Sequence, residues 1–290
     1  MNRWVLGVIG GSGLYDVEGL EGPETIEIAS PWGTPSGPLL RGRLAGIEVA
    51  FLPRHGHGHR IGPSEINARA NIDVLKRAGC TDVLSLSAVG SLREHLAPGT
   101  FVAVDQYIDR TVGRAASFFG EGCVAHVSMA EPVCARLSGL AAAAGRRIGA
   151  DVVEGGTYLA MEGPQFSTRA ESLLYLQWGC DVIGMTGMPE AKLAREAELP
   201  YASICMVTDY DAWREGEAAV EVEHILEVMH ANAARARALV RDLAGALAAM
   251  ERTASPIDTA LDGAIITAPS HRDAALMAKL DAVAGRVLKG

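Results

Sequence analysis

Short apolar runs alternate with helical segments along this chain, and this alternation restricts its fold more than any other feature. Apolar runs of strand length occupy residues 4–9, 81–87, 100–107, 151–161, 181–185 and 201–207, and a hairpin is indicated at 39–44 and 47–52. Helical patterns cover residues 65–78, 132–145, 189–197 and 220–250. Strands that alternate with helices at this spacing indicate a mostly parallel or mixed sheet with helices on both faces. We therefore expect the α/β class, with a central mixed β-sheet flanked by helices.

A single domain is expected to cover residues 1–250, followed by a C-terminal tail with a short helix over residues 251–290. The chain has 290 residues, of which 49% are hydrophobic and 21% charged, so it can bury one large core. The tail helix is expected at residues 274–288. Neither the tail nor the long loop at residues 110–128 has an obvious core of its own, and we expect both to pack on a neighbouring copy.

The composition argues against several classes of partner. A net charge of −9 opposes binding to a nucleic acid or an anionic membrane surface, because phosphate groups would be repelled. No apolar segment is long enough to span a bilayer, and the apolar run after Arg3 is too short for a signal peptide. The five cysteines are scattered and odd in number, which is typical of reduced thiols in packing positions. We therefore expect a cytoplasmic protein that acts on small molecules.

Two acids follow the apolar run at residues 201–207, in the order Thr208-Asp209-Tyr210-Asp211. A continuous apolar run bounded by polar residues predicts a buried strand. Ligands of open α/β sheets bind just outside the carboxyl ends of the strands. Asp209 and Asp211 are therefore placed to accept hydrogen bonds from a ligand or to carry a proton. The alternative is a pair of solvated acids in a turn.

Groups that bind anions follow other predicted strands. The first strand opens into the turn GGSG, whose backbone N–H groups and Ser12 hydroxyl suit a phosphate. The second strand of the hairpin leads to Arg54 and His55, where arginine offers a forked pair of donors and histidine another donor. Ser87 and Thr186 follow two further strands. These residues predict a phosphate site at one edge of the sheet.

Other interpretations of the same loops are less well supported. The turn GGSG is similar to part of a dinucleotide fingerprint, but Asp16 stands where that pattern needs its last glycine. His55, His57 and His59 alternate along the next loop, as zinc ligands can, but the glycines between them and two flanking arginines oppose a cation there. A histidine-rich loop without any ligand stays open as an alternative.

A site with phosphate donors at one end and paired acids for a donor-rich ring at the other suits the phosphorolysis of a nucleoside. Seven motifs occur in chain order: IGGSGLY, RHGHGH, SAVGSLRE, MAEP, EGPQFSTRAES, GMTGMPEA and MVTDYDAW. Together they resemble the methylthioadenosine phosphorylases of the trimeric purine nucleoside phosphorylase group, from about Val5 to Met250. The resemblance implies a nucleoside phosphorylase fold and a homotrimer, or a dimer of such trimers.

The implied reaction joins 5′-methylthioadenosine and inorganic phosphate, and gives adenine and 5-methylthioribose 1-phosphate for methionine and purine salvage. Phosphate is a co-substrate, and the resemblance implies no metal and no organic cofactor. The alternatives are a 6-oxopurine nucleoside or methylthioinosine phosphorylase, which the segment GMTGMPEA also resembles, and a nucleoside-binding protein without catalysis. Aspartate at both 209 and 211 favours adenine, because a carboxylate faces the oxygen of a 6-oxopurine with like polarity.

The resemblance also implies roles for particular residues. Phosphate is assigned to Ser12, Arg54, His55, Ser87, Ala88 and Thr186. Met185 is assigned to the ribose, Phe166 to the purine and Tyr210 to substrate binding, and Asp209 and Asp211 are assigned to adenine recognition and the catalytic proton. Base and 5′-group preference is assigned to Ser167, Val222, Ile225, His59 and His126, with His126 reaching the site of a neighbouring subunit. Gln165 stands where the family commonly has arginine, so one cation is missing near the site.

Overall fold

A ten-residue strand, β5 (Asp82–Ser91), lies at the centre of the sheet. The structure, a computed structural model, describes residues 3–11, 18–214 and 222–288, without the side chains of residues 222–227, 229 and 230. The other strands are β1 (Val5–Gly10), β2 (Leu20–Ile26), β3 (Leu39–Leu44), β4 (Ile47–Pro53), β6 (Phe101–Val104), β7 (Gln106–Asp109), β8 (Val152–Glu154), β9 (Thr157–Ala160), β10 (Val182–Gly184) and β11 (Tyr201–Asp209). The α-helices are α1 (Ala68–Arg77), α2 (Ala135–Arg147), α3 (Arg169–Gln177), α4 (Gly187–Glu196), α5 (Val222–Ala248), α6 (Ala274–Lys279) and α7 (Gly285–Leu288). Short 3-10 helices cover Asp211–Trp213, Pro256–Thr259 and Pro269–His271.

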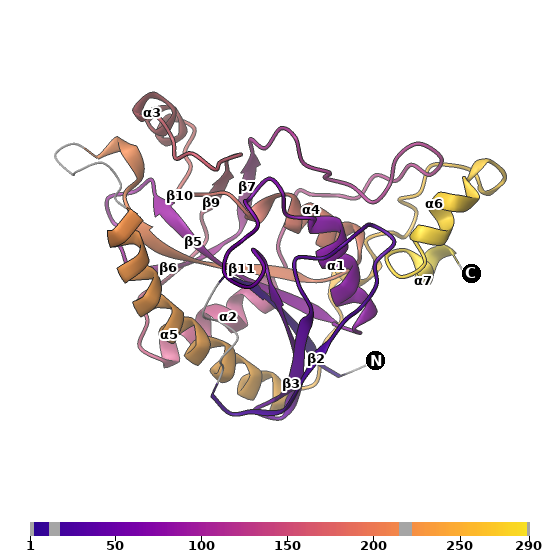
Figure 1. Cartoon of the computed structure of the whole chain (residues 1–290), viewed down its shortest axis with the longest axis horizontal. Helices are drawn as coiled ribbons and strands as arrows, with labels where there is room; N and C mark the ends of the chain where they lie inside the picture. Colours follow the sequence, from indigo (N-terminus) through magenta and orange to yellow (C-terminus); the bar gives the residue numbers. More distant parts are fainter. Residues whose placement is uncertain (1–2, 12–17, 215–221, 289–290) are drawn as a thin grey trace.

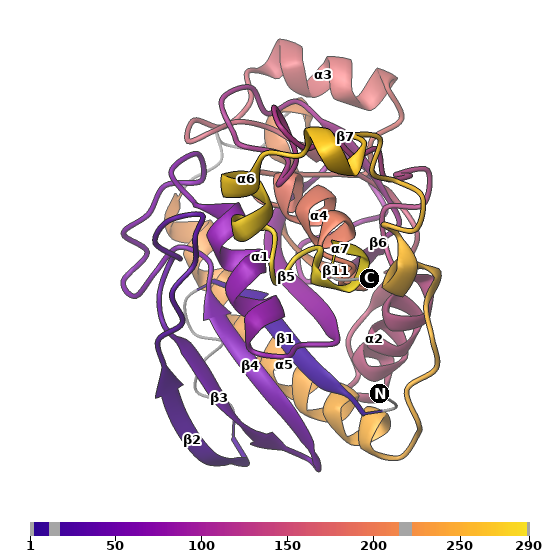
Figure 2. The same ribbon diagram turned by 90° about the vertical axis from the view of Figure 1, so that its right-hand side faces the viewer.

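Within the described residues, eleven strands form one mixed sheet that branches at β5 (Figures 1 and 2). β5 is parallel to β1 and β11 and antiparallel to β10. One arm continues from β1 through β4 and β3 to β2, a second from β10 through β9 to β7, and a third from β11 through β6 to β8. The predicted mixed sheet and the predicted hairpin, β3–β4, are therefore confirmed.

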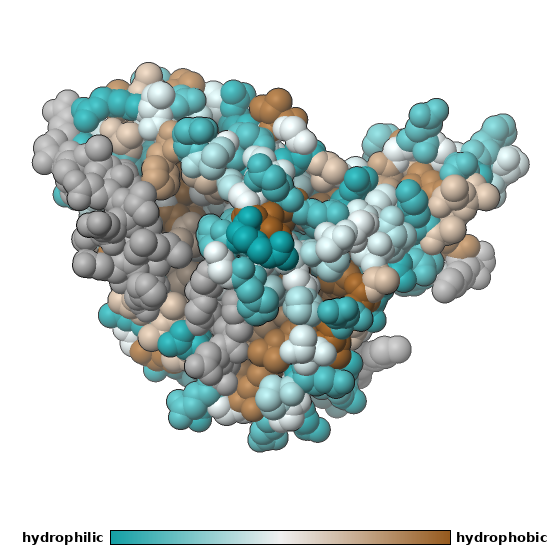
Figure 3. Space-filling view, viewed as in Figure 1, coloured by the Kyte–Doolittle hydropathy of each residue, from teal (hydrophilic) through white to brown (hydrophobic). Residues whose placement is uncertain are grey.

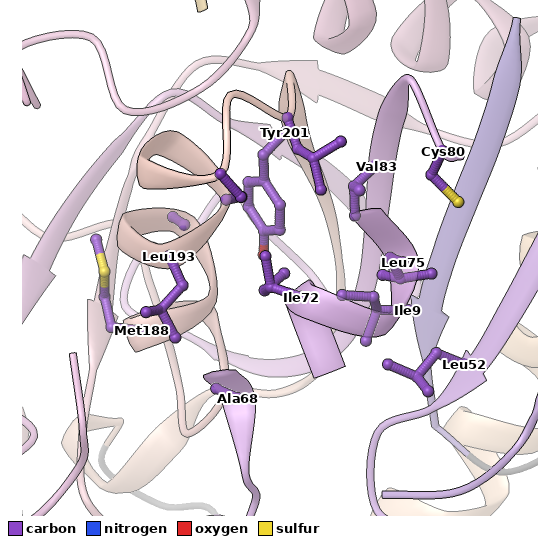
Figure 4. Close-up of a cluster of buried hydrophobic side chains, with 14 of the residues drawn as sticks. Ile9, Leu52, Ala68, Ile72, Leu75, Cys80, Val83, Met188, Leu193 and Tyr201 are labelled. Carbon is purple, nitrogen blue, oxygen red and sulfur yellow. The ribbon is translucent and has the colours of Figure 1, made fainter. Parts of the chain in front are cut away.

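The burial of β11 explains why its sequence is one continuous apolar run. Its side chains point alternately to two buried faces, so that Tyr201 belongs to one core and Ile204 to the other. Helices α1 and α4 cover the first face, where Ile72 and Leu193 lie near Tyr201 (Figure 4). Helices α2 and α5 cover the second face. Because both faces are covered, the carboxyl ends of the strands are the natural place for a ligand.

Strand β2 is not indicated by the sequence pattern. It is an exposed edge strand, and its register with β3 shifts between Glu21 and Glu24, around Pro23. An edge strand that is exposed and contains a bulge and a proline need not alternate apolar and polar residues, and the sequence of β2 shows no such alternation.

Two expected strands are each divided in the structure. The run at residues 100–107 divides at Asp105 into β6 and β7, and the run at residues 151–161 divides before Thr157 into β8 and β9. The two breaks lie side by side, since the Asp105 carboxylate accepts the Gly156 N–H at 3.0 Å. At this point both segments pass from the β11 arm of the sheet to the β10 arm. A hydrophobic pattern alone does not reveal such a change of neighbour.

The tail and the long loop both pack within the same chain, so neither depends on another copy for a core, in contrast to the reason given for expecting them to pack on a neighbour. Phe118 of the loop and Leu261 and Val283 of the tail are buried in the same core. An isolated β-bridge joins the two segments. Arg286 of the tail pairs with Glu198, just after α4, at 2.6 Å. Figure 2 shows α6 and α7 lying over α1 and α4.

Helix starts follow capping side chains. The capping box predicted at Thr168 and Glu171 is present at the start of α3. The helix expected from residue 65 begins at Ala68, because the side chain of Asn67 accepts the Ala70 N–H as the N-cap. The single helix expected at residues 274–288 is divided into α6 and α7.

The five cysteines are buried and free, in agreement with the packing role predicted for them. Burial raises the pKa of the Cys80 and Cys205 thiols to about 12, so both stay protonated at neutral pH. None of the helices in the described ranges is both long and apolar enough to cross a bilayer.

Candidate active site

A cavity of about 350 Å³ lies at the carboxyl ends of β1, β4, β5 and β11. Its wall contains ten residues that the sequence assigns to the site: Arg54, His55, His59, Ser87, Ala88, Phe166, Met185, Thr186, Asp209 and Asp211. Figure 3 shows a recessed apolar area below α3 on this side of the molecule. The sheet thus brings together side chains that are far apart in the sequence.

Arg54 follows β4 and is only 2% exposed. Its Nε and Nη2 atoms form a fork that binds the carboxylate of Glu190, in α4, at 2.5 and 3.1 Å. Nη1 donates to the Leu86 carbonyl at 2.9 Å, and Nη2 also donates to the Ser85 hydroxyl at 2.6 Å. Burial opposes the charge of Arg54, but the attraction of Glu190 outweighs it and raises the guanidinium pKa. The fork expected to hold phosphate is therefore bound by Glu190, which leaves the Nη1 edge for a ligand.

His55 stacks on His59, with the ring centroids 4.1 Å apart and an angle of 15° between the ring planes. Its Nδ1 lies 2.9 Å from the Ile61 carbonyl, which can only accept, so Nδ1 carries the hydrogen. Burial lowers the pKa of His55 to about 4; the bond to Ile61 opposes this shift and the charge of Arg54 adds to it. Neutral His55 presents Nε2 as an acceptor. It would therefore receive a hydrogen bond from a protonated phosphate oxygen, in contrast to the donor role expected from the sequence.

Two hydroxyls lie on the same wall, since the Oγ atoms of Ser87 and Thr186 are 3.2 Å apart. The backbone N–H groups of Thr186 and Gly187 donate to the hydroxyl of the buried Tyr158 at 3.2 and 3.4 Å. Tyr158 thereby fixes the segment that leads into α4. Gly184 allows this approach, because a Cβ atom there would lie 2.1 Å from the Tyr158 hydroxyl.

Asp209 and Asp211 lie at the end of β11, where the register with β5 shifts. The Asp209 Oδ1 accepts the Thr208 hydroxyl at 2.6 Å, and Oδ2 accepts the Asp211 N–H at 2.9 Å. The Asp211 carboxylate accepts the Ser172 hydroxyl, from α3, at 2.5 Å. Burial raises the pKa of Asp211 and the charge of Asp209 adds to this, although the bond from Ser172 opposes it. The pair therefore holds a proton more readily than a free aspartate does.

Phe166 and Met185 belong to the apolar part of the wall, together with Met161 and Pro164. Phe166 lies in the turn before α3 and is 49% exposed. A flat ligand entering the cavity would cover it, and an aromatic ring gains contact area and offset stacking from a flat partner.

Tyr210 and Ser167 are not among the residues that line the cavity in the described structure. The Tyr210 hydroxyl donates to the Glu94 carbonyl at 3.4 Å, and its ring lies 4.0 Å from the Arg214 guanidinium. Ser167 is buried, with its hydroxyl 3.8 Å from the Met161 sulfur, and a hydrogen bond from it opposes the raised pKa of Asp211. Both side chains therefore support the site from outside the cavity.

His126 lies beside the tail, where its backbone N–H donates to the Ala264 carbonyl at 2.9 Å. It is not among the described residues that line the cavity. Gln165 is exposed to solvent beside Phe166. Ser12 lies outside the described residues, as do the side chains of Val222 and Ile225. Among the residues that are described, no three His, Cys, Asp or Glu side chains converge as metal ligands would.

A sequence profile of the phosphorylase superfamily matches residues 5–244. The chain belongs to this superfamily. It is 59% identical over 290 residues to the S-methyl-5′-thioadenosine phosphorylase of Cereibacter sphaeroides. The alignment covers 99% of this chain and 100% of that relative. A methylthioadenosine phosphorylase from an antarctic soil metagenomic library matches in structure with a TM-score of 0.91 and 44% identity, over 98% of this chain and 99% of that chain.

A more distant solved structure of the superfamily contains a nucleoside. It is a variant of the adenosine/methylthioadenosine phosphorylase from Schistosoma mansoni in complex with methylthioadenosine. It matches with a TM-score of 0.78 and 36% identity, over 86% of this chain and 93% of that chain. The predicted family, its fold and its enzyme class are therefore confirmed.

Sequence reasoning missed two buried residues of this superfamily member. Glu190 stands after a proline near a helix start, where an acid is ordinary, and its partner Arg54 is 136 positions away. Tyr158 lies in an apolar strand, and only the tertiary structure brings its hydroxyl within hydrogen-bond distance of the backbone at the start of α4. The motif GMTGMPEA contains Glu190, so the motif was the available signal, but no local rule gives the residue its role.

Proposed function

We propose that this chain catalyses the phosphorolysis of 5′-methylthioadenosine to adenine and 5-methylthioribose 1-phosphate. The observation that carries the proposal is a single cavity in which Ser87, Thr186 and Arg54 are joined with the acids Asp209 and Asp211. Similar proteins that bear the name of this activity match the chain over nearly its whole length. Inorganic phosphate is the second substrate, and the reaction uses no metal or organic cofactor.

The reaction breaks the bond between C1′ of the sugar and N9 of adenine, and a phosphate oxygen forms the new bond to C1′. The electron pair of the broken bond stays on adenine, which leaves more readily when a proton reaches N7. The Asp209–Asp211 pair suits this proton transfer, because burial and the charge of Asp209 raise the pKa of Asp211. The negative charge of the attacking phosphate stabilises the cationic sugar of the transition state.

A 6-oxopurine nucleoside is the second candidate substrate, and the segment GMTGMPEA favours it. The carboxylate of Asp209 favours adenine, because it accepts from N6–H and faces O6 with like polarity. Phosphate-dependent release of free base from methylthioadenosine, methylthioinosine, adenosine and inosine tests the proposal in one comparison. Release of base from methylthioinosine and inosine alone would support the 6-oxopurine activity. If none of the four nucleosides released base, the chain would be a nucleoside-binding protein without this activity.

We expect kcat/KM for methylthioadenosine to exceed that for adenosine by about tenfold or more. The 5′ group is assigned to Val222 and Ile225, with His59 in the cavity wall. An apolar pocket gains from the methylthio group and leaves a 5′-hydroxyl without a full set of partners, at a cost of about 1–3 kcal/mol. Initial rates with each nucleoside at saturating phosphate give the ratio. Equal values would refute an apolar 5′ pocket.

We further propose that the chain works in the cytoplasm as a homotrimer, or as a dimer of such trimers. A group of apolar side chains on and beside α3 supports self-association, since each is between 41% and 89% exposed: Val112, Phe166, Leu173, Leu174 and Trp178. Large exposed apolar areas mark contact surfaces. A neighbouring copy seated there would cover Phe166 at the mouth of the cavity and could supply His126 to the 5′ end.

Light scattering is expected to give a mass of three or six chains. The double variant Leu173→Ser/Trp178→Ser is expected to shift the protein toward monomers and to raise KM for the nucleoside, because the cavity mouth loses its cover. Met250→Ser is the matched control, since Met250 is 44% exposed at the far end of α5. A stable monomeric wild type with full activity would contradict the proposed assembly.

A further inference from the structure

Arg114 is a buried cation in the long loop at residues 110–128. Its side chain is only 5% exposed, although the loop around it has no helix or strand. The sequence gives it no role, and it is not among the residues that line the cavity in the described structure. An arginine that loses its water must find acceptors for its N–H groups inside the protein.

The contacts of Arg114 match the donors of a guanidinium one for one. Nη1 donates to the Met185 carbonyl at 2.5 Å and to the Met188 carbonyl at 2.8 Å. Nη2 donates to the carbonyls of Met161, at 3.4 Å, and Glu162, at 2.6 Å. Nε points to the Glu162 carboxylate at 3.4 Å. Since guanidinium carries five N–H groups, each has an acceptor.

These acceptors belong to two separate segments of the cavity wall. The carbonyls of Met185 and Met188 flank Thr186 and Gly187, and the side chains of Met185 and Thr186 line the cavity. Met161 lines the cavity on the other segment, in the turn that leads to Phe166. Lysine could not bridge both segments in the same way, because its ammonium is a single point of donation at the end of a flexible stem.

The Glu162 carboxylate extends this link to a third segment. It accepts the Val112 N–H at 2.6 Å and the Ser64 hydroxyl at 2.5 Å. It therefore joins the loop to Ser64, whose neighbour Pro63 also lines the cavity. The acids at the other end of the cavity are held differently. Thr208 and Ser172, which bind Asp209 and Asp211, make no contact with Arg114 among the described residues, and Ser167 adds a further bond to Asp211.

We propose that Arg114 is a positioning residue that fixes Met185 and Thr186 for the sugar and the phosphate, while the acids that recognise adenine are bound by Thr208 and Ser172. This inference rests on the proposed function, because it assigns phosphate to Thr186. It makes a selective prediction. Without Arg114, phosphate and the sugar lose their alignment, and the binding of free adenine changes less than the binding of phosphate.

The test compares Arg114→Met and Arg114→Lys with the wild type. We expect Arg114→Met to lower kcat and to raise KM for phosphate, with a combined loss in kcat/KM of about a hundredfold, since a misplacement of about 1 Å costs that much. Arg114→Lys is expected to fall between this variant and the wild type. The dissociation constant of free adenine, measured by calorimetry, is expected to change less than KM for phosphate in both variants, because Thr208 and Ser172 keep their hydrogen bonds to the acids.

Arg252→Met is the matched control, because Arg252 is also a buried arginine that joins distant segments. It pairs with Asp82 and Asp258 at 2.6 Å each, away from the cavity. We expect this control to lower Tm without changing KM for phosphate. Millimolar guanidinium is expected to restore part of the activity of Arg114→Ala and to leave the activity of the control unchanged.

The proposal is overturned if Arg114→Met loses phosphate and adenine affinity equally, or keeps wild-type kinetics while its Tm falls. If Arg114→Met does not fold, Arg114→Lys decides the question by the same two constants. Failure of the proposed function would look different, because the wild type itself would release no adenine. In that case calorimetry with inorganic phosphate alone still compares the three proteins.

Discussion

Replacing Asp209 with asparagine is expected to lower kcat/KM for methylthioadenosine by about a hundredfold or more, within the range that a lost general acid costs. The carboxyl pair at residues 209 and 211 would then hold a proton less readily, because the charge of Asp209, which adds to the raised pKa of Asp211, is gone. Activity on methylthioinosine is expected to rise relative to that on methylthioadenosine. An asparagine amide can donate to O6, whereas a carboxylate cannot.

The structure indicates that this variant will keep its fold. The Thr208 hydroxyl lies 2.6 Å from Asp209 Oδ1 and 3.2 Å from the Val89 carbonyl, and its single hydrogen serves one of them at a time. With asparagine, the amide can donate to the Thr208 oxygen while that hydroxyl donates to Val89. The amide oxygen can still accept the Asp211 N–H, as Oδ2 does now. A loss of activity would therefore report on chemistry and base recognition.

Steady-state kinetics on both nucleosides, with Tm measured alongside, checks this expectation. Asp105→Asn is the matched control, since its carboxylate also accepts a backbone N–H, from Gly156, but at the bend of the sheet. It is expected to keep wild-type kinetics. If Asp209→Asn keeps the wild-type kcat/KM for methylthioadenosine, Asp209 neither donates the proton nor recognises the base.

Replacing Glu190 with glutamine is expected to lower the free energy of unfolding by about 3–5 kcal/mol, the usual cost of removing one partner of a buried ion pair. Arg54 and Glu190 are each 2% exposed, so water cannot hydrate the charge that would remain on Arg54. Because the guanidinium of arginine does not lose its proton in proteins, Arg54 would remain a buried, unpaired charge. The Tyr201 hydroxyl, 3.2 Å from Glu190 Oε2, would also lose its charged acceptor.

Chemical denaturation at a fixed protein concentration measures the change. The double variant Arg54→Met/Glu190→Leu separates charge from packing, because replacing a whole buried pair by apolar residues is often neutral or stabilising. We expect it to be more stable than Glu190→Gln, and to have lost phosphate binding in calorimetry. A double variant that is no more stable than the single one would show that the pair is not what holds this region together.

Local patterns in the sequence determined the class of the fold and the position of most elements. The run at residues 201–207 predicts β11 because a strand buried on both faces must be apolar at every position. The capping box at Thr168 predicts the start of α3, since it involves only residues three apart. Seven short motifs determined the family, and the profile match over residues 5–244 agrees with them.

The tertiary structure alone decided which side chains meet. The sequence predicts Arg54 as a phosphate ligand, yet its fork binds Glu190, 136 positions away. The tail was expected to need another copy, and Val283 instead enters the core of its own chain. Arg114 gained a role only because the loop carries it to carbonyls 47 to 74 positions away. Periodicity and caps depend on neighbours in sequence, whereas buried charges and apolar side chains are satisfied by whichever distant segments the sheet brings within reach.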